Sequence, residues 1–267
     1  MSLLCEWRKW DSENFPYVLD MDADVLKSPG WKPRVAKYES WGEATGAPDF
    51  CKSDDRRLHL GLIPVPFTGD MLNASIYILM INPGLGPADY FEYEVPRFRK
   101  ALLANLRQEH KSGAMPFVFL DPQFAWHGGF RYWHQKLKGV IEALATANCI
   151  SLADARATLG RKLAVVQLVP YHSAVFKLSS KALKQLSSVR LAQDFVRQTV
   201  SDRVKARKAI VIVARQVNAW DPYLPDDLGE EHGVIRYPHP EATGASLSPK
   251  SRGGCAILRH LGVGADC

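Results

Sequence analysis

The sequence contains few cysteines, and none is placed to form a recognisable site. The five cysteines are scattered, and no two of them form a CxxC pair. This pattern indicates neither a disulfide framework nor a zinc or iron–sulfur site. The N-terminus lacks the apolar segment of a secretory signal, and no apolar run approaches the length of a membrane span. We therefore expect a reducing intracellular location, most simply the cytoplasm, with no membrane partner.

The motifs of several enzyme classes are also missing. The sequence has no Walker loop and no nucleophile–base pattern. Gly84-Leu85-Gly86 lacks the third glycine of a dinucleotide-binding fingerprint, and His127 and His134 do not have the spacing of metal ligands. There is no internal repeat and no low-complexity stretch. We therefore predict neither a metal nor another cofactor.

The composition is that of a globular protein with a basic surface. A chain of 267 residues with 46% apolar and 23% charged residues can bury a full core. The formal net charge of +6 favours an anionic partner, most often nucleic acid, although many basic proteins bind none. The basic side chains of residues 180–208 are more simply interpreted as a solvated face than as a nucleic-acid surface.

Four apolar runs predict strands, and helical patterns separate them. The strands are predicted at Ile76–Ile81, Leu163–Val169, Ala209–Ala214 and Gly233–Tyr237. Helices are predicted at Arg97–His110, Phe130–Ala147, Ser151–Leu159, Ser180–Lys208 (in two pieces that meet near Ser187) and Gly254–Leu261. Pro116–Asp121 is interpreted as a short edge strand. Strands alternating with helices indicate an α/β fold, with a mainly parallel sheet covered on both faces.

The first 70 residues differ from the rest in composition. They are rich in proline, glycine and aromatic residues, so we predict an extension that packs on a core domain of residues 71–267. Leu58–Asp70 is apolar but contains two prolines, which favours an extended segment beside the first strand. A protein-interaction role for the extension is left open.

Polar side chains follow the strands at their carboxyl ends, where open α/β sheets bind ligands. They are Asn82, the segment from Gln167 to His172, Arg215 and His239. Asn82 can orient a water molecule but is no strong base. His239 lies between two prolines and is the best candidate for a titrating or oxyanion-stabilising group, although a lone histidine is usually a surface residue.

Further candidates for ligand contact lie in and beside these segments. Gln167 could read the edge of a base, or it could be a buried glutamine with all its hydrogen bonds made. Phe91 and Tyr93 follow the first turn and could stack on a planar ligand. As core residues they would have the same pattern in the sequence.

The order of these motifs resembles the uracil-DNA glycosylase superfamily. Ile81-Asn82-Pro83-Gly84 is similar to the first motif of its mismatch-specific and single-strand-selective branches, and Pro238-His239-Pro240 is similar to the second motif. Val165–His172 occupies the place of the middle strand, whose end carries a base-reading asparagine. The resemblance covers roughly residues 75–251. It implies a three-layer α/β/α sandwich with a central four-stranded sheet and DNA as the partner.

The resemblance also implies a role for each matching residue. Asn82 would position the hydrolytic water, and His239 would stabilise the departing base. The base-binding residues would be Gly84, Phe91, Tyr93, Gln167 and His172. Leu247 would be the wedge that fills the gap left in the DNA. The residues that hold phosphates would be Ser246, Ser248, Lys250 and Arg252.

Three departures from the family pattern leave two functions open. Glu241 replaces the serine of the second motif, and a carboxylate repels DNA phosphates. Gln167 replaces the base-reading asparagine, so the base need not be uracil. Asn82 itself replaces the aspartate of the fastest branch. The sequence therefore predicts either a glycosylase acting on a deaminated or damaged base, or a non-catalytic protein that binds nucleic acid or a nucleotide with the same fold.

Overall fold

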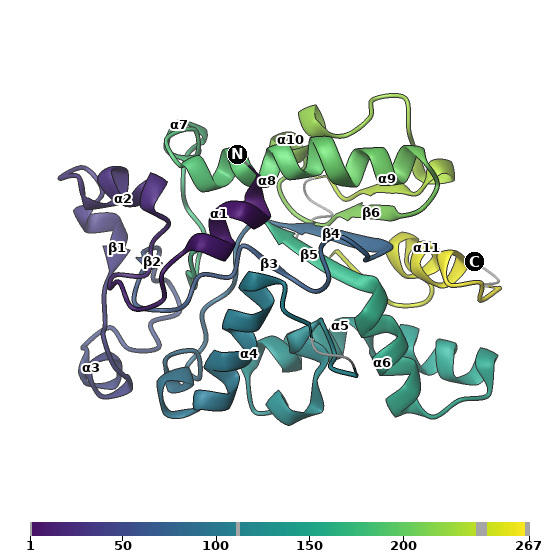
Figure 1. Ribbon diagram of the computed structural model, residues 1–267, viewed down its shortest axis with the longest axis horizontal. Coiled ribbons are helices and arrows are strands. Elements are labelled where there is room, and N and C mark those ends of the chain that lie inside the picture. The colour runs from purple at the N-terminus through teal and green to yellow at the C-terminus, as the bar shows by residue number, and fades with distance from the viewer. Residues whose placement is uncertain (1, 111–112, 239–244, 265–267) are drawn as a thin grey trace.

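A central five-stranded sheet organises the computed structural model, which describes residues 2–110, 113–238 and 245–264. In spatial order its strands are β3 (Phe67–Thr68), β5 (Leu163–Gln167), β4 (Ile76–Met80), β6 (Ile210–Val213) and β7 (Val234–Arg236). Strands β5, β4, β6 and β7 are parallel, whereas β3 runs antiparallel to β5. Every residue of β4, β5 and β6 is buried, as expected of parallel strands covered on both faces (Figure 1). The predicted α/β class and parallel strands are confirmed.

Two expectations about strands are wrong. The sheet has five strands rather than four, and the segment before β4 pairs with β5, so that Phe67 lies opposite Val166. Both edges of β4 are already occupied by β5 and β6, and the added strand therefore takes the open edge of β5. Pro116–Asp121 contains a 3₁₀ turn, η3 (Val118–Leu120), instead of a strand. Its apolar side chains are buried against α5, and periodicity cannot separate so short a buried turn from a strand.

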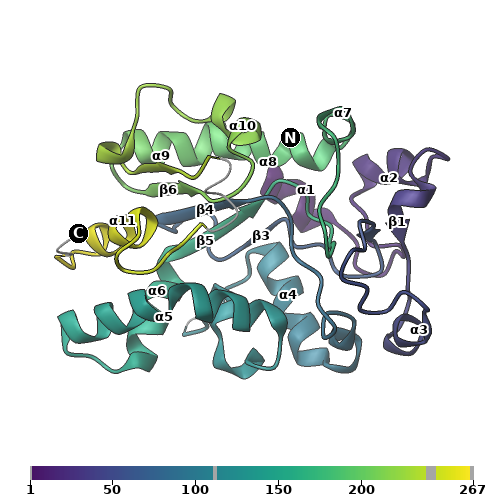
Figure 2. The same cartoon turned by 180° about the vertical axis from the view of Figure 1, so that it is seen from behind.

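Helices lie on both sides of the sheet (Figures 1 and 2). One group comprises α4 (Pro96–Arg107), α5 (Gly128–Asn148), α6 (Leu152–Lys162) and α11 (Arg252–His260). The other comprises α7 (Ser180–Leu183), α8 (Ser187–Phe195), α9 (Ser201–Lys205) and α10 (Val217–Trp220), with a π-helical turn at Val196–Val200 between α8 and α9. Ser151 is the N-cap of α6, since its side chain accepts a hydrogen bond from the amide of Asp154.

Residues 2–66 form short elements that pack on the sheet and its helices, whereas Phe67–Thr68 is strand β3 of the sheet itself. They are α1 (Leu3–Lys9), α2 (Asp20–Lys27), α3 (Trp41–Gly46) and a parallel pair, β1 (Val35–Ala36) with β2 (Leu58–His59). Helix α1 contacts both α4 and α8, and Trp7 is buried in the same hydrophobic core as the sheet. The buried carboxylate of Asp22 accepts hydrogen bonds from the hydroxyl of Tyr171 (2.8 Å) and the amide of Ser188 (3.1 Å). The N-terminal segment therefore supports the chain directly before His172.

The remaining regular elements are 3₁₀ turns. They are η1 (Lys32–Arg34), η2 (Tyr90–Glu94), η4 (Pro122–Phe124), η6 (Asp221–Tyr223) and η7 (Glu230–His232). None of the helices in the described ranges combines the length and the apolar character needed to cross a membrane.

Candidate functional site

A cavity of about 830 Å³ opens at the carboxyl ends of β4, β5, β6 and β7. Its lining includes the first motif, Ile81 to Gly84, and three residues that the sequence placed at the ends of other strands: Gln167, His172 and Arg215. Pro238, which precedes the predicted His239, also lines it. His239 and Glu241 lie outside the described residues. The parallel strands thus bring the predicted polar groups to one cavity, whose volume is typical of a small-molecule site.

The side-chain amide of Asn82 is held in one orientation. Its Nδ2 lies 2.7 Å from the carbonyl oxygen of Pro83, 3.2 Å from that of Tyr171 and 2.9 Å from Oγ of Ser173. Carbonyl oxygens only accept hydrogen bonds, so the atom that faces them must be the amide nitrogen. Oδ1 of Asn82 makes no hydrogen bond within the described part of the chain. The cavity wall therefore carries a fixed acceptor.

Gln167, the last residue of β5, lies beside Met80 at the end of β4. The residue is 7% exposed, and its Oε1 is buried without a hydrogen-bond partner among the described residues. The interpretation of Gln167 as a buried glutamine with all its hydrogen bonds made is therefore wrong. An unpaired buried amide oxygen costs about 1–3 kcal/mol. A ligand that donates a hydrogen bond to it would recover that energy, and the same amide has two donors to offer.

A buried pair, Asp89 and His127, forms another part of the cavity wall. Nδ1 of His127 accepts a hydrogen bond from the amide of Gly129, so Nε2 carries the proton and donates it to Asp89 at 3.1 Å. Burial opposes ionisation of Asp89, but the hydrogen bond from His127 and the electrostatic interaction with that ring outweigh it, and the pKa of Asp89 is lowered. Asp89 also accepts a hydrogen bond from the amide of Gly86. The pair thus joins the loop after β4 to the start of α5, and both ring nitrogens of His127 are engaged.

His172 supports the same loop. Its Nδ1 lies 2.9 Å from the carbonyl oxygen of Gly84, and its Nε2 lies 3.2 Å from that of Ile63. Burial lowers the pKa of His172, which favours the neutral ring. A neutral imidazole donates through one nitrogen only. His172 therefore donates to one of these two carbonyl oxygens, and each of its ring nitrogens faces the backbone rather than the cavity.

The predicted stacking residues lie elsewhere. Neither Phe91 nor Tyr93 lines the cavity. The chain enters the 3₁₀ turn η2 at Tyr90, which directs Phe91 against Trp41 and Trp126 and brings the hydroxyl of Tyr93 to the carbonyl of Gly61. The aromatic residues that line the cavity are Phe119, Tyr132, Trp133, Phe176 and Tyr237. The sequence analysis chose Phe91 and Tyr93 because they follow the first motif closely, and that criterion did not identify the five aromatic residues of the cavity.

The segment before α11 places the predicted DNA-binding residues in different surroundings. Leu247 is 4% exposed and belongs to the hydrophobic core, so in this structure its side chain is not available as a wedge. Arg252 pairs with Glu230 at 2.6 Å and lies over the ring of Tyr237. The side chains of Ser246 and Ser248 bond to each other at 3.1 Å. Lys250 is exposed, as a phosphate-binding residue must be.

Gly254 allows this segment to approach α11 closely. A β-carbon at Gly254 would overlap the carbonyl of Ser248. We expect Gly254→Ala to lower the free energy of unfolding by about 2 kcal/mol, because backbone cannot move aside as a flexible side chain can. Urea denaturation measures the change. Gly42→Ala is the matched control, since a β-carbon at this helical glycine meets nothing within 4 Å. Equal stability of both variants with the wild type would contradict the close contact.

Comparison of the chain with protein-family models, with curated proteins and with solved structures gave no match. No group of three or more histidine, cysteine or acidic residues in the described ranges could hold a metal ion. The assignment of a function therefore depends on the cavity itself.

Proposed function

We propose that the protein hydrolyses the N-glycosidic bond of a deaminated or damaged base in DNA, on a fold related to that of the uracil-DNA glycosylases. The observation that carries the proposal is the oriented amide of Asn82, whose Oδ1 makes no hydrogen bond to the described residues and which lines the same cavity as Gln167 with its unpaired Oε1. The Asn82 amide oxygen can accept a hydrogen bond from a water molecule, and the Gln167 amide can form hydrogen bonds with the edge of a base. The net charge of +6 favours an anionic partner such as DNA. The cytoplasmic location stays a prediction.

The chemistry follows from what each group is able to do. An amide oxygen is a weak base, so Asn82 orients the attacking water without deprotonating it. The glycosidic bond must then be largely broken before water attacks, which makes stabilisation of the departing base the main requirement. Gln167 can donate to a base carbonyl and accept from the neighbouring ring N–H, the pattern that uracil and hypoxanthine present. His239 is the proposed stabiliser of the charge on the leaving base.

Base release from modified oligonucleotides tests the proposal. Single- and double-stranded substrates would carry uracil, hypoxanthine or a mismatch. We expect Asn82→Ala to slow release about 100-fold, the lower end of the effect of a positioned catalytic group, because the water loses its acceptor. Gln167→Ala is expected to weaken the discrimination between bases. Asn148→Ala, at the end of α5 and bonded only to its own helix, is the matched control.

The second candidate is a protein that binds a nucleotide or nucleic acid without cleaving it. It is favoured by the burial of Leu247 and by the ring nitrogens of His127 and His172, which face protein groups. No base release by folded wild-type protein on any substrate would reject the glycosylase. Binding that weakens with salt would then support the second candidate.

A further inference from the structure

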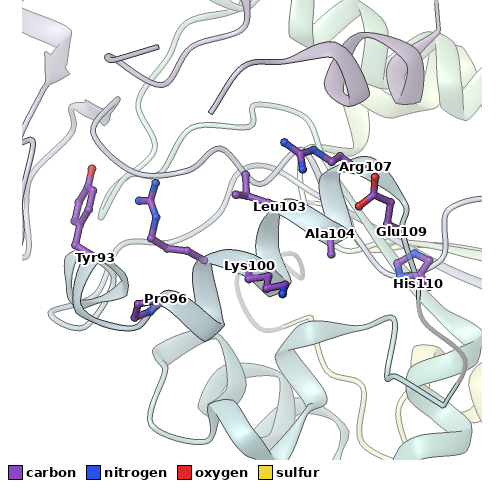
Figure 3. A pocket seen from close by; sticks show the side chains of 9 residues that line it. Tyr93, Pro96, Lys100, Leu103, Ala104, Arg107, Glu109 and His110 are labelled. Carbon is purple, nitrogen blue, oxygen red and sulfur yellow. The ribbon is translucent and has the colours of Figure 1, made fainter. Parts of the chain in front are cut away.

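A second hollow, of about 680 Å³, lies along the outer face of α4 and shares no lining residue with the cavity. The helical residues that line it recur every three or four positions and so form one stripe, at Pro96, Arg99, Lys100, Leu103, Ala104 and Arg107. Figure 3 shows Tyr93 at one end of this stripe and Glu109 with His110 at the other. We call this hollow the α4 groove. The opposite face of α4 carries the buried residues Phe98, Leu102 and Leu106.

The α4 groove is cationic. Arg99, Lys100 and Arg107 contribute three positive charges, and Glu109 contributes one negative charge. No carboxylate in the described ranges forms a salt bridge with Lys100 or Arg107. A row of charges with a positive balance and concave apolar walls attracts an anionic partner more strongly than scattered surface charges do.

Two polar atoms of residues that line the groove are buried without a hydrogen-bond partner in the part of the chain that the structure describes. One is Nη1 of Arg99, whose guanidinium lies over the rings of Tyr17 (5.7 Å) and Tyr93 (5.1 Å). The other is Nε2 of His110. An unpaired guanidinium N–H in a buried position is costly. The Arg99 N–H therefore indicates a missing acceptor, and the aromatic rings hold the Arg99 group in place to receive it.

The spacing of the charges selects the kind of partner. Arg99 and Arg107 are eight residues apart, which is about 12 Å along a helix. One phosphate cannot contact both, whereas a chain of phosphates can. Apolar and cationic positions alternate along the stripe, from Tyr93 and Pro96 through Arg99 to Leu103 and then Arg107. This alternation matches a strand whose bases contact apolar surface while its phosphates contact cations.

We propose that the α4 groove binds a segment of single-stranded DNA through its phosphodiester backbone. The proposal takes its nucleic-acid partner from the proposed function but does not require base release. The groove would hold part of the strand away from the cavity and add affinity that is independent of the base being read. Its energetic signature would be a strong dependence on salt.

Binding of an undamaged oligothymidylate of about 12 nucleotides tests the groove without involving base release. We expect the double variant Lys100→Glu/Arg107→Glu to bind at least tenfold more weakly at low salt. The slope of log K against log salt should also fall by about 1.4, since each phosphate contact with a single strand contributes about 0.7. Fluorescence anisotropy over a salt series gives both quantities, and thermal unfolding verifies that the variants are folded.

The control is Lys205→Glu/Lys208→Glu, at and just beyond the end of α9 on the other side of the sheet (Figure 1). Each double variant changes two cations to anions, so the net charge falls from +6 by 4 to +2 in both. Equal loss of binding in both variants would show general attraction and overturn the proposal. Unchanged binding by the groove variant would also overturn it, as would binding of polyglutamate with the affinity of DNA. If the groove variant alone loses binding, the groove proposal holds even when no base is released.

Discussion

Replacing Asn82 by aspartate is expected to destabilise the protein by about 3 kcal/mol at pH 8, although the two side chains have nearly the same shape. In the wild type, Nδ2 donates to the carbonyls of Pro83 and Tyr171. A carboxylate would place an oxygen against those two oxygens. Both carbonyls would lose a donor, and a buried negative charge would face two partial negative charges. The strand end therefore requires an amide at this position.

The aspartate variant should recover stability in acid. Its carboxyl is expected to have a raised pKa, because protonation supplies one donor to the carbonyls and removes the charge. A raised pKa in the folded state means that stability falls as pH rises through that value. Urea denaturation at pH 5 and pH 8 should therefore show a larger deficit at pH 8. Ser173→Ala is the control, since it removes one partner of Asn82 and leaves both carbonyls paired. Wild-type stability of Asn82→Asp at pH 8 would contradict the amide orientation described above.

The strands that could be predicted are those formed by uninterrupted apolar runs of sequence. Ile76–Met80 and Ile210–Val213 are continuous buried runs of strand length, and each became a central parallel strand. Phe67–Thr68 could not be assigned in the same way. It has only two paired residues, and its partner depends on which edge of the sheet remains open after the other strands have paired. Edge pairing is a property of the assembled sheet and leaves little trace in local sequence.

The site residues also fall into two groups, those that the sequence predicted and those that it did not. Asn82 and Gln167 were predictable because the carboxyl ends of parallel strands meet at one edge. The directions of Phe91, Tyr93 and Leu247 were not, because side chains in a 3₁₀ turn or a loop point where tertiary packing allows. The pair formed by Asp89 and His127 links residues 38 positions apart and matches no motif. The only local signal was the glycine pair after His127, which marks a helix start.

The second large effect is expected at Glu92, a carboxyl with no counter-charge in contact. Glu92 is 2% exposed, and its side-chain carboxyl accepts only one hydrogen bond from the described residues, from the amide of Ile63 at 3.2 Å. Burial raises the pKa of Glu92 to about 8, and the nearby charge of Asp89 acts in the same direction. At neutral pH the folded protein therefore keeps this carboxyl protonated, while the unfolded chain ionises it.

This difference makes Glu92 a source of instability that grows with pH. The folded pKa of Glu92 lies above the unfolded value. The destabilisation by Glu92 is therefore absent below about pH 4.5 and grows by about 1.4 kcal/mol per pH unit up to about pH 8. At pH 7 the cost is roughly 3 kcal/mol, and above pH 8 it approaches 5 kcal/mol. Glutamine keeps the acceptor for Ile63 without ionising. We expect Glu92→Gln to raise the free energy of unfolding by about 2 kcal/mol at pH 7, after about 1 kcal/mol is lost to an imperfectly paired amide.

Comparison with the wild type at two pH values isolates the effect of Glu92. Buried histidines such as His59 and His172 have lowered pKa values and so act in the opposite direction, destabilising the fold as pH falls below about 6.5. They are present in both proteins and cancel in the difference. The advantage of Glu92→Gln should be more than 2 kcal/mol larger at pH 8 than at pH 6. Glu94→Gln, an exposed glutamate on the same turn, should show no such trend. An advantage of Glu92→Gln that is the same at both pH values would mean that Glu92 ionises as freely in the folded protein as in the unfolded chain.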